Sequence, residues 1–295
     1  WGCDAVNYMY FRTAMLSAVL AAVFSLCGCE MPESNATALL AAEMTAHFID
    51  VGQADSIFVE LPEGKTMLVD AGNNKDGSTV VGYLHSLGVG KIDYLVGTHP
   101  HADHIGGMDD VIDEFEIGDF YMPRATTNTK TFEEVLDAAE RKGLKIKTAK
   151  AGKSLFETEN AACEILSPVE DKYSNLNEYS AVLMLTYGNI RFLLTGDMEA
   201  KNETEIAGDV HADVLKVAHH GSDTSSTDKF LKRVSPEYAV ISVGENNKYS
   251  HPSDAVVDRL EADGVRILRT DRDGTIIIAT DGENIKYKTE KGDKN

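Results

Sequence analysis

Two hairpin-like segments that each end in an aspartate limit the folds open to this chain. In the first, the β-rich runs SIFVEL (56–61) and TMLVDAG (66–72) are joined by the turn P-E-G-K and lead to Asp70. In the second, SAVLMLTYGNIRFLLTGD (180–197) turns at Y-G-N and leads to Asp197. Apolar β-rich runs on either side of turn residues are typical of β-hairpins. The repetition indicates two related β-rich halves.

Strands and helices alternate through the rest of the chain, with no linker after Ala46. Further strands are predicted at 46–52, 92–99, 120–123, 145–148, 213–222, 237–244, 265–270 and 275–280, and helices at 78–88, 105–116, 131–142, 227–234 and 253–263. Two mixed β-sheets flanked by helices, an αββα sandwich of the α/β class, accommodate these elements best. The sequence therefore predicts one domain over residues 46–290.

The N-terminal segment has the composition of an export signal. Arg12 precedes the uncharged apolar stretch TAMLSAVLAAVFSLCGC (13–29), the order found in secretory signal peptides. The stretch ends in L-C-G-C, which resembles the bacterial lipobox and implies acylation of Cys29 and attachment to the membrane through that lipid. The prediction is a signal peptide at 1–28, a tether at 29–45 and an extracytoplasmic protein, membrane-anchored or secreted. An uncleaved anchor is the alternative, because about 17 apolar residues just span a bilayer.

Composition limits the partners of the protein. Hydrophobic residues make up 43% of the 295 residues and charged residues 26%, enough for a substantial core. The net charge of −20 argues against non-specific binding to nucleic acid or anionic membranes, which requires a basic surface. It leaves room for a polyanionic substrate at a cleft that metal ions make locally positive. No protein partner can be inferred from these features.

Ligand-type side chains crowd into T-H-P-H-A-D-H (98–104), where the predicted strand at 92–99 ends. His99, His101, Asp103 and His104 fall within six positions, although the chain has only nine histidines. Imidazole and carboxylate groups are ligands for zinc, manganese and iron. A solvated polar loop is the alternative, but the crowding favours a metal site.

T-H-P-H-A-D-H after a strand is similar to the metal motif of the metallo-β-lactamase superfamily. Five further segments resemble, in the same order, the extracellular hydrolase domain of ComEC-type DNA-uptake proteins and their stand-alone relatives: HFIDVGQADSIFVELPEGKTMLVDAG, LLTGD, DVLKVAHHGSDTSS, ENNKYSHP and RTDRDGTIII. The resemblance covers residues 46–280 and implies an αββα fold with a dinuclear metal site at the sheet edges. Two departures matter. Ala54 replaces the second glycine of the usual V-G-Q-G-D, and no histidine lies between His104 and Asp197, where many members carry a further ligand.

The resemblance implies ligand roles that the residue types support. His99 and His101 would chelate one ion, Asp103 and His104 would face a second, and Asp197 would bridge the two. Two ions roughly 3.5–4 Å apart would lower the pKa of a bridging water and supply hydroxide. With nitrogen and oxygen ligands, the expected cofactors are two divalent ions, Zn²⁺ or Mn²⁺. Asp103 is also a candidate catalytic residue.

Three further histidines compete for the remaining ligand positions. His219 and His220 end the predicted strand at 213–222, where neighbouring side chains point to opposite faces. One of them is therefore expected to bind metal, and His220 is favoured. His251, on the loop GENNKYSHP (244–252), could protonate a leaving oxygen as a general acid or serve as the missing ligand. A solvent-exposed loop histidine is the alternative.

The loops around the motif also carry candidate substrate contacts. Ser222, Asn247 and Lys248 are the predicted substrate-binding residues, because a loop before a helix can bind phosphate oxygens. N-capping of the helix that starts near residue 227 is the competing interpretation of the first loop. Asp55 and Asp70 are predicted to support the site, although a turn aspartate would also explain Asp70.

Together these features predict a secreted metal-dependent hydrolase. The favoured activity is that of a ComEC-like phosphodiesterase or nuclease with DNA as a candidate substrate. A cell-envelope phosphocholine-type esterase and a lactonase- or lactamase-like hydrolase are the alternatives. A non-catalytic module that binds DNA or wall polymer is the least favoured, because pure binding has no use for a hydroxide generator.

Overall fold

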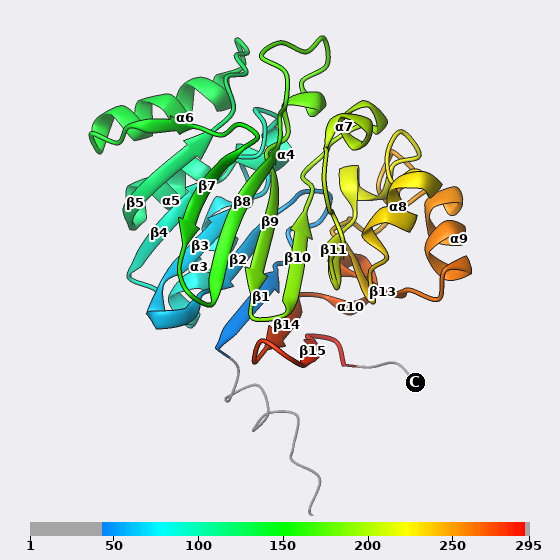
Figure 1. Cartoon of the computed structure of the whole chain (residues 1–295). Helices are drawn as coiled ribbons and strands as arrows, with labels where there is room; N and C mark the ends of the chain where they lie inside the picture. The colour runs from blue at the N-terminus through cyan, green and yellow to red at the C-terminus, as the bar shows by residue number, and fades with distance from the viewer. Residues whose placement is uncertain (1–42, 293–295) are drawn as a thin grey trace, which may run out of the picture. The chain divides into compact units, whose positions relative to one another are not determined.

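Two mixed β-sheets packed face to face form the centre of the computed structural model, which describes residues 43–292 (Figure 1). The first sheet has eight strands in the order β15-β14-β1-β2-β3-β4-β5-β6, and the second has seven in the order β13-β12-β11-β10-β9-β8-β7. Helices α3, α5 and α6 pack on the outer face of the first sheet, and α8 and α9 on that of the second. The predicted αββα sandwich is confirmed.

The strands of the first sheet are β1 (Met44–Phe48), β2 (Ile57–Glu60), β3 (Thr66–Val69), β4 (Lys91–Val96), β5 (Glu116–Met122), β6 (Ile146–Thr148), β14 (Ile276–Thr280) and β15 (Ile285–Thr289). Those of the second are β7 (Lys153–Glu157), β8 (Ala161–Ser167), β9 (Val182–Tyr187), β10 (Ile190–Leu194), β11 (Val214–Lys216), β12 (Tyr238–Ile241) and β13 (Arg266–Arg269). The α-helices are α3 (Gly77–Ser86), α4 (Ala102–Ile105), α5 (Met108–Glu114), α6 (Lys130–Arg141), α7 (Ala200–Glu205), α8 (Asp228–Val234), α9 (Asp254–Ala262) and α10 (Thr270–Asp273).

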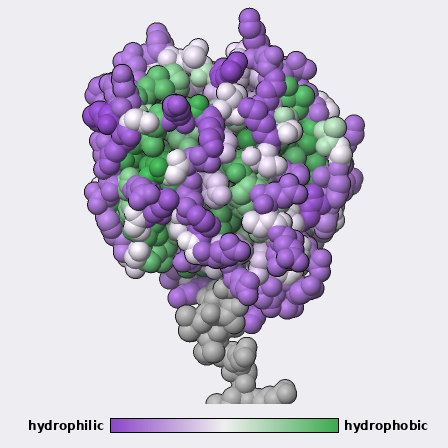
Figure 2. Space-filling model, turned by 60° about the vertical axis from the view of Figure 1, so that its left-hand side comes forward, coloured by the Kyte–Doolittle hydropathy of each residue, from purple (hydrophilic) through white to green (hydrophobic). Residues whose placement is uncertain are grey.

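Apolar side chains fill three layers, one between the sheets and one under each group of helices. Strand β2 shows how one strand serves two layers: Ile57 and Val59 face the other sheet, while Phe58 packs under the helices. This alternation follows from the two-residue period of a strand. Phe58 is fully buried, and full burial of such a side chain contributes about 1.5–3 kcal/mol. Hydrophilic residues cover most of the face shown in Figure 2, with separate apolar areas between them.

The N-terminal predictions fall mostly outside the described residues. The predicted signal peptide, Cys29 and most of the predicted tether lie in residues 1–42, whereas Met44 and Thr45 already belong to β1. Strand β1 thus begins slightly before the predicted boundary at residue 46. Among residues 43–292, no helix has the length and apolar character needed to cross a bilayer.

Both predicted hairpins are present, as β2–β3 and β9–β10, but two other predicted elements are wrong. The predicted helix at 105–116 is two short helices, α4 and α5, separated at Gly106 and Gly107. A Cβ atom on Gly106 would lie 2.2 Å from the backbone nitrogen of Asn74, so glycine is required where this turn packs on its neighbour. Glu116 already begins β5. The predicted strand at 213–222 ends at Lys216, and a 3₁₀ turn (Ala218–Gly221) follows.

Several polar segments follow strands that end at the same edge of the sandwich. Strands β3 and β4 run parallel, as do β10, β11 and β12. The loops after them carry Asp70, the segment 98–104, Asp197, the segment 219–222 and His251. The topology thus brings together ligand-type residues that are far apart in the sequence.

Candidate metal centre

His99 and His101 form the first group of ligand atoms, on the loop after β4. The Nε2 atom of His99 lies 2.9 Å from the Nδ1 atom of His101. His99 is fully buried, and its Nδ1 atom is close to the hydroxyl groups of Thr98 (3.2 Å) and Ser180 (3.4 Å). Two ring nitrogens that face each other at this distance can share a proton or bind one cation.

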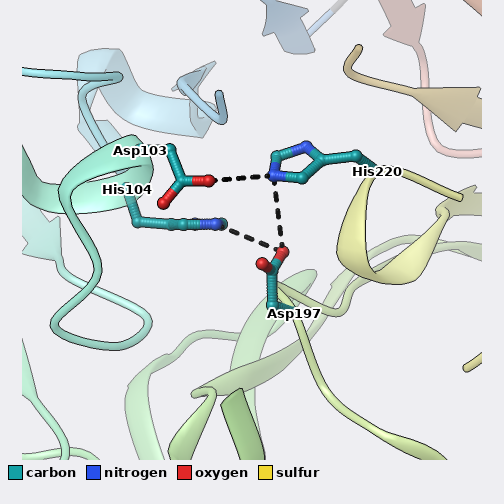
Figure 3. A group of neighbouring side chains, drawn as sticks. All are labelled: Asp103, His104, Asp197 and His220. Atoms are coloured by element: carbon teal, nitrogen blue, oxygen red, sulfur yellow. Dashed lines mark ion pairs between the residues drawn. The ribbon is translucent and has the colours of Figure 1, made fainter. Parts of the chain in front are cut away.

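Asp103, His104, Asp197 and His220 form the second group (Figure 3). One ligand atom from each lies within 4.8 Å of the others. The Asp197 Oδ1 atom is 3.2 Å from His104 Nε2 and 3.8 Å from His220 Nε2. These three atoms are buried and have no hydrogen-bond partner. An unpaired buried polar atom costs about 1–3 kcal/mol, so their convergence fits a bound cation.

The carboxylate of Asp197 faces both groups. While Oδ1 faces the second group, Oδ2 lies 3.9 Å from His99 Nε2 and 3.7 Å from His219 Nε2. A hydrogen bond from the backbone nitrogen of Asp197 to Ser180 Oγ holds the residue just beyond the end of β10. This position is the one that a bridging carboxylate requires.

Asp55 and Asp70 lie behind His220 and His104. Asp70 accepts hydrogen bonds from the backbone nitrogen of Thr98 and, at 2.7 Å, contacts His104 Nδ1. Asp55 Oδ1 lies 3.4 Å from His220 Nδ1, and that nitrogen also contacts the carbonyl oxygen of Ser242 at 2.9 Å. Because each Nδ1 atom faces an acceptor, it carries the proton and leaves the Nε2 lone pair free for a cation.

The buried carboxylates around the second group of ligand atoms favour positive charge at His104 and His220. Burial lowers the pKa of His220, but the charges of Asp197 and Asp55 outweigh burial and raise that pKa to about 10. Burial also lowers the pKa of His104, but the charges of Asp197 and Asp70 outweigh burial and raise that pKa well above its usual value. Burial raises the pKa of Asp197, yet the positive histidines hold it well below its usual range. Divalent ions at these atoms would supply the same positive charge in place of the protons.

The structure corrects the placement of His219 and His220. They do not end a strand but lie in the turn after β11, both with left-handed backbone angles (φ 50° and 53°). They therefore do not point to opposite faces of a sheet, and both approach Asp197. His220 is buried against the second group, as favoured from the sequence, whereas His219 faces the first group.

A cavity of about 280 Å³ opens onto the two groups. It is lined by Gln53, His101, Ala102, Asp103, Asn177, Asp197, His219, His220, Tyr249 and His251. His251 thus lies at the site, with a buried Nδ1 atom that has no partner and a ring 5.6 Å from that of His219.

The side chain of Asn247 makes its hydrogen bonds within its own loop. Its amide nitrogen donates to the carbonyl oxygens of Gly244 and His251, and its amide oxygen accepts from the backbone nitrogens of Tyr249 and His251. All four hydrogen-bonding positions of the side chain are used within the loop, where they position His251, and a contact with substrate stays a prediction.

Ser222 and Lys248 are not among the residues that line the cavity. The Ser222 hydroxyl bonds to that of Thr224, and the Lys248 ammonium lies 4.9 Å above the ring of Tyr249. In the same region Thr227 is the N-cap of α8, and its side chain accepts from the backbone nitrogen of Phe230. Thr227 thus caps α8, as the N-capping interpretation predicts, and a substrate contact of Ser222 stays a prediction.

A model of the metallo-β-lactamase superfamily matches residues 49–245, about two thirds of the chain. The chain belongs to the metallo-β-lactamase superfamily. It is related to competence proteins, as its sequence motifs indicated. It is 32% identical over 257 residues to ComE operon protein 3 of Bacillus subtilis strain 168, covering 80% of this chain and 33% of that protein. It is 33% identical over 232 residues to competence protein ComA of Neisseria gonorrhoeae, covering 77% of this chain and 31% of that protein. The chain thus spans about a third of the length of these relatives.

Solved structures of low sequence identity share the metallo-β-lactamase fold. The metallo-β-lactamase fold protein YhfI from Bacillus subtilis superposes with a TM-score of 0.51 at 11% identity, covering 77% of this chain and 96% of that one. CmlA, a diiron β-hydroxylase from Streptomyces venezuelae, gives a TM-score of 0.51 at 14% identity, covering 77% and 53%. At such identities the likeness concerns the fold alone.

Sequence reasoning missed Lys216, which lies directly behind the metallo-β-lactamase site. This lysine is fully buried at the end of β11, and its Nζ atom lies 2.8 Å from Asp55 Oδ2 and 3.0 Å from the carbonyl oxygen of Val217. A lysine at the end of a strand ordinarily points to solvent, so no sequence signal marked it. It balances the charge of Asp55 and so fixes the carboxylate that faces His220.

Replacing Lys216 with methionine should destabilise the protein by about 3–5 kcal/mol, because the change removes the nearest of the positive groups that balance the buried charge of Asp55. Urea unfolding of the metal-free protein measures this loss. Lys232→Met, which removes an exposed ion pair with Asp228 within α8, is the control and should leave the free energy of unfolding nearly unchanged. Equal stabilities of the two variants would contradict the role given to Lys216.

Proposed function

We propose that the protein is a dinuclear metal-dependent hydrolase that cleaves phosphodiesters, with nucleic acid as its preferred substrate class. The observation that carries the proposal is the position of Asp197, whose two oxygens face two separate groups of buried nitrogen and oxygen ligands at one cavity. The relation to competence proteins supports nucleic acid as the substrate.

His99 and His101 would hold one ion, and Asp103, His104 and His220 the other, with Asp197 shared. When bound, two divalent ions lower the pKa of water to provide a nucleophile and neutralise charge on the phosphoryl group. Zn²⁺ and Mn²⁺ both suit these ligands. The ions would also offset the acidic character of the chain, whose net charge of −20 otherwise repels a polyanion.

The chain's own residues would orient the substrate and deliver the proton. His251 lies on the cavity wall, and the Asn247 side chain holds its backbone on both sides. From this wall the imidazole can reach a leaving oxygen in the cavity and donate a proton to it. Gln53, whose buried Nε2 has no partner, can donate to a phosphoryl oxygen from the opposite loop.

The test compares substrates on one metal-loaded preparation. The protein, loaded with Mn²⁺ and separately with Zn²⁺, is assayed on single-stranded DNA, bis-p-nitrophenyl phosphate, p-nitrophenyl phosphocholine and a lactam. We expect metal-dependent turnover of the two phosphodiesters, with DNA cleaved. Preference for the phosphocholine ester or the lactam would replace the proposal with an envelope esterase or a lactamase-like hydrolase. Metal binding without turnover of any substrate would leave a binding module.

We also propose that the protein acts outside the cytoplasm, attached to the membrane by a lipid on Cys29. Because acylation needs the thiol, Cys29→Ser should move the protein from the membrane fraction to the soluble fraction, or stall it at precursor length. Cell fractionation with mass spectrometry of the N-terminus measures this, and Cys163→Ser, which changes a buried cysteine, is the control. Unchanged membrane attachment at precursor length would favour an uncleaved anchor.

A further inference from the structure

Asn177, which lines the cavity at the two ligand groups, has an amide oxygen without a hydrogen-bond partner. The residue begins the short 3₁₀ helix Asn177–Tyr179 before β9, in the stretch between His104 and Asp197 that contains no histidine. Its side chain lines the cavity and is only 7% exposed, yet its Oδ1 atom is buried without a hydrogen-bond partner. Because such an atom is costly to leave unpaired, its position points to a ligand in the cavity.

Glu199 determines which way the amide faces. The Nδ2 atom of Asn177 lies 3.0 Å from Glu199 Oε1. An ionised carboxylate can only accept hydrogen bonds, so the amide atom on this side must be the NH₂ group. The amide oxygen is thereby turned away from Glu199.

The same oxygen of Glu199 also orients His219. It lies 3.3 Å from His219 Nδ1, while His219 Nε2 lies 3.7 Å from Asp197 Oδ2, the oxygen that also faces His99. A carboxylate behind Nδ1 leaves the Nε2 lone pair free, as is usual for histidines that bind metal. One acidic residue therefore fixes two donor atoms at the same cavity.

We propose that Asn177 Oδ1 and His219 Nε2 complete the coordination of the ion held by His99 and His101, and that Glu199 is the positioning residue for both. The inference rests on the metal centre of the proposed function, not on its substrate. The two donors take the place of the histidine that many superfamily members carry in this stretch. Since a carbonyl oxygen suits Mn²⁺ better than imidazole does, this half of the centre favours Mn²⁺ more than a centre with a third histidine would.

Counting bound Mn²⁺ tests the inference without any substrate. The full chain is stripped with chelator and dialysed against a series of Mn²⁺ concentrations, and bound metal is measured by mass spectrometry. The variant Asn177→Leu keeps the branched shape of the side chain but lacks the amide. We expect two equivalents in the unsubstituted protein, and in the variant one equivalent of unchanged affinity and one weakened about 10–100-fold or more. Ser174→Ala is the control, because it changes the same loop at an exposed position and should bind Mn²⁺ as the unsubstituted protein does.

A second variant tests the metal preference. Asn177→His restores an imidazole, so competition between Zn²⁺ and Mn²⁺ should shift toward Zn²⁺ by about tenfold relative to the unsubstituted protein. Two equivalents of Mn²⁺ bound by Asn177→Leu with unchanged affinity would overturn the inference. If a folded Asn177→His protein has unchanged metal selectivity, the claim that the Asn177 oxygen stands in for a histidine ligand is overturned. If the metal counts follow the expectation but no phosphodiester is cleaved, the proposed function fails and the inference stands.

Discussion

Replacing Asp197 with alanine should lower total bound metal below one equivalent and reduce phosphodiester hydrolysis by at least about 10³-fold. The reason is that one carboxylate faces both groups of ligand atoms, so its removal weakens both ions at once. The ions stabilise the transition state by several kcal/mol, and the loss of about 4 kcal/mol lowers the rate about 10³-fold. Metal analysis after dialysis and initial rates on bis-p-nitrophenyl phosphate measure the two effects.

Folding should survive the change, because Asp197 lies beyond the end of β10 and contributes no apolar contact to the core. Circular dichroism and thermal unfolding in chelator check this. Asp223→Ala is the matched control, since it removes one negative charge from an exposed position on the neighbouring loop. Retention of two equivalents of metal by Asp197→Ala would remove Asp197 from the centre.

Replacing His251 with alanine should keep both ions and cut DNA hydrolysis by about 10²–10⁴-fold. A general acid matters most when the leaving oxygen is a poor leaving group, so p-nitrophenyl esters should be largely spared. His220→Ala should instead lose metal and activity on every substrate, because its Nε2 atom converges with Asp103 and Asp197. Comparing rates on DNA and on bis-p-nitrophenyl phosphate, with metal counts for each variant, separates the two roles.

His85→Ala, an exposed histidine on α3 that pairs with Glu114, is the control and should behave as the unsubstituted protein. Burial, and then the charge of His219, lower the pKa of His251, so its protonated form is depleted as the pH rises through that lowered pKa. The ratio of DNA rate to p-nitrophenyl ester rate should therefore fall with rising pH, and His251→Ala should lack this trend. Loss of an ion from His251→Ala would instead make the histidine a ligand.

The layered fold could be predicted because its strands carry strong local signals. The strands β2, β3, β9 and β10 are short apolar runs beside turn residues, and their pairing is local in the sequence. The hairpin β7–β8 and strand β15 were not predicted, because exposed charged residues such as Lys153, Glu164 and Lys286 interrupt their apolar pattern. The break between α4 and α5 depends on the close approach of Gly106 to Asn74, which periodicity does not reveal.

Some residues of the candidate site could likewise be predicted from the sequence, and others could not. The crowded motif His99 to His104 and the strand-end Asp197 are visible because ligand-type residues recur at short spacing. Asn177, Glu199 and Lys216 are single residues of common type, and only the tertiary structure brings them to the cavity or behind it. The orientation of His219 and His220 depends on left-handed backbone angles that the strand pattern before them does not predict.

Titrating metal-free protein with Mn²⁺ while following the rate of phosphodiester hydrolysis tests the central claim most directly. If both ions are needed for hydrolysis, the rate stays low until one equivalent of Mn²⁺ has bound and reaches its maximum near two equivalents. A maximum at one equivalent, or no hydrolysis after two equivalents have bound, would contradict a dinuclear phosphodiesterase.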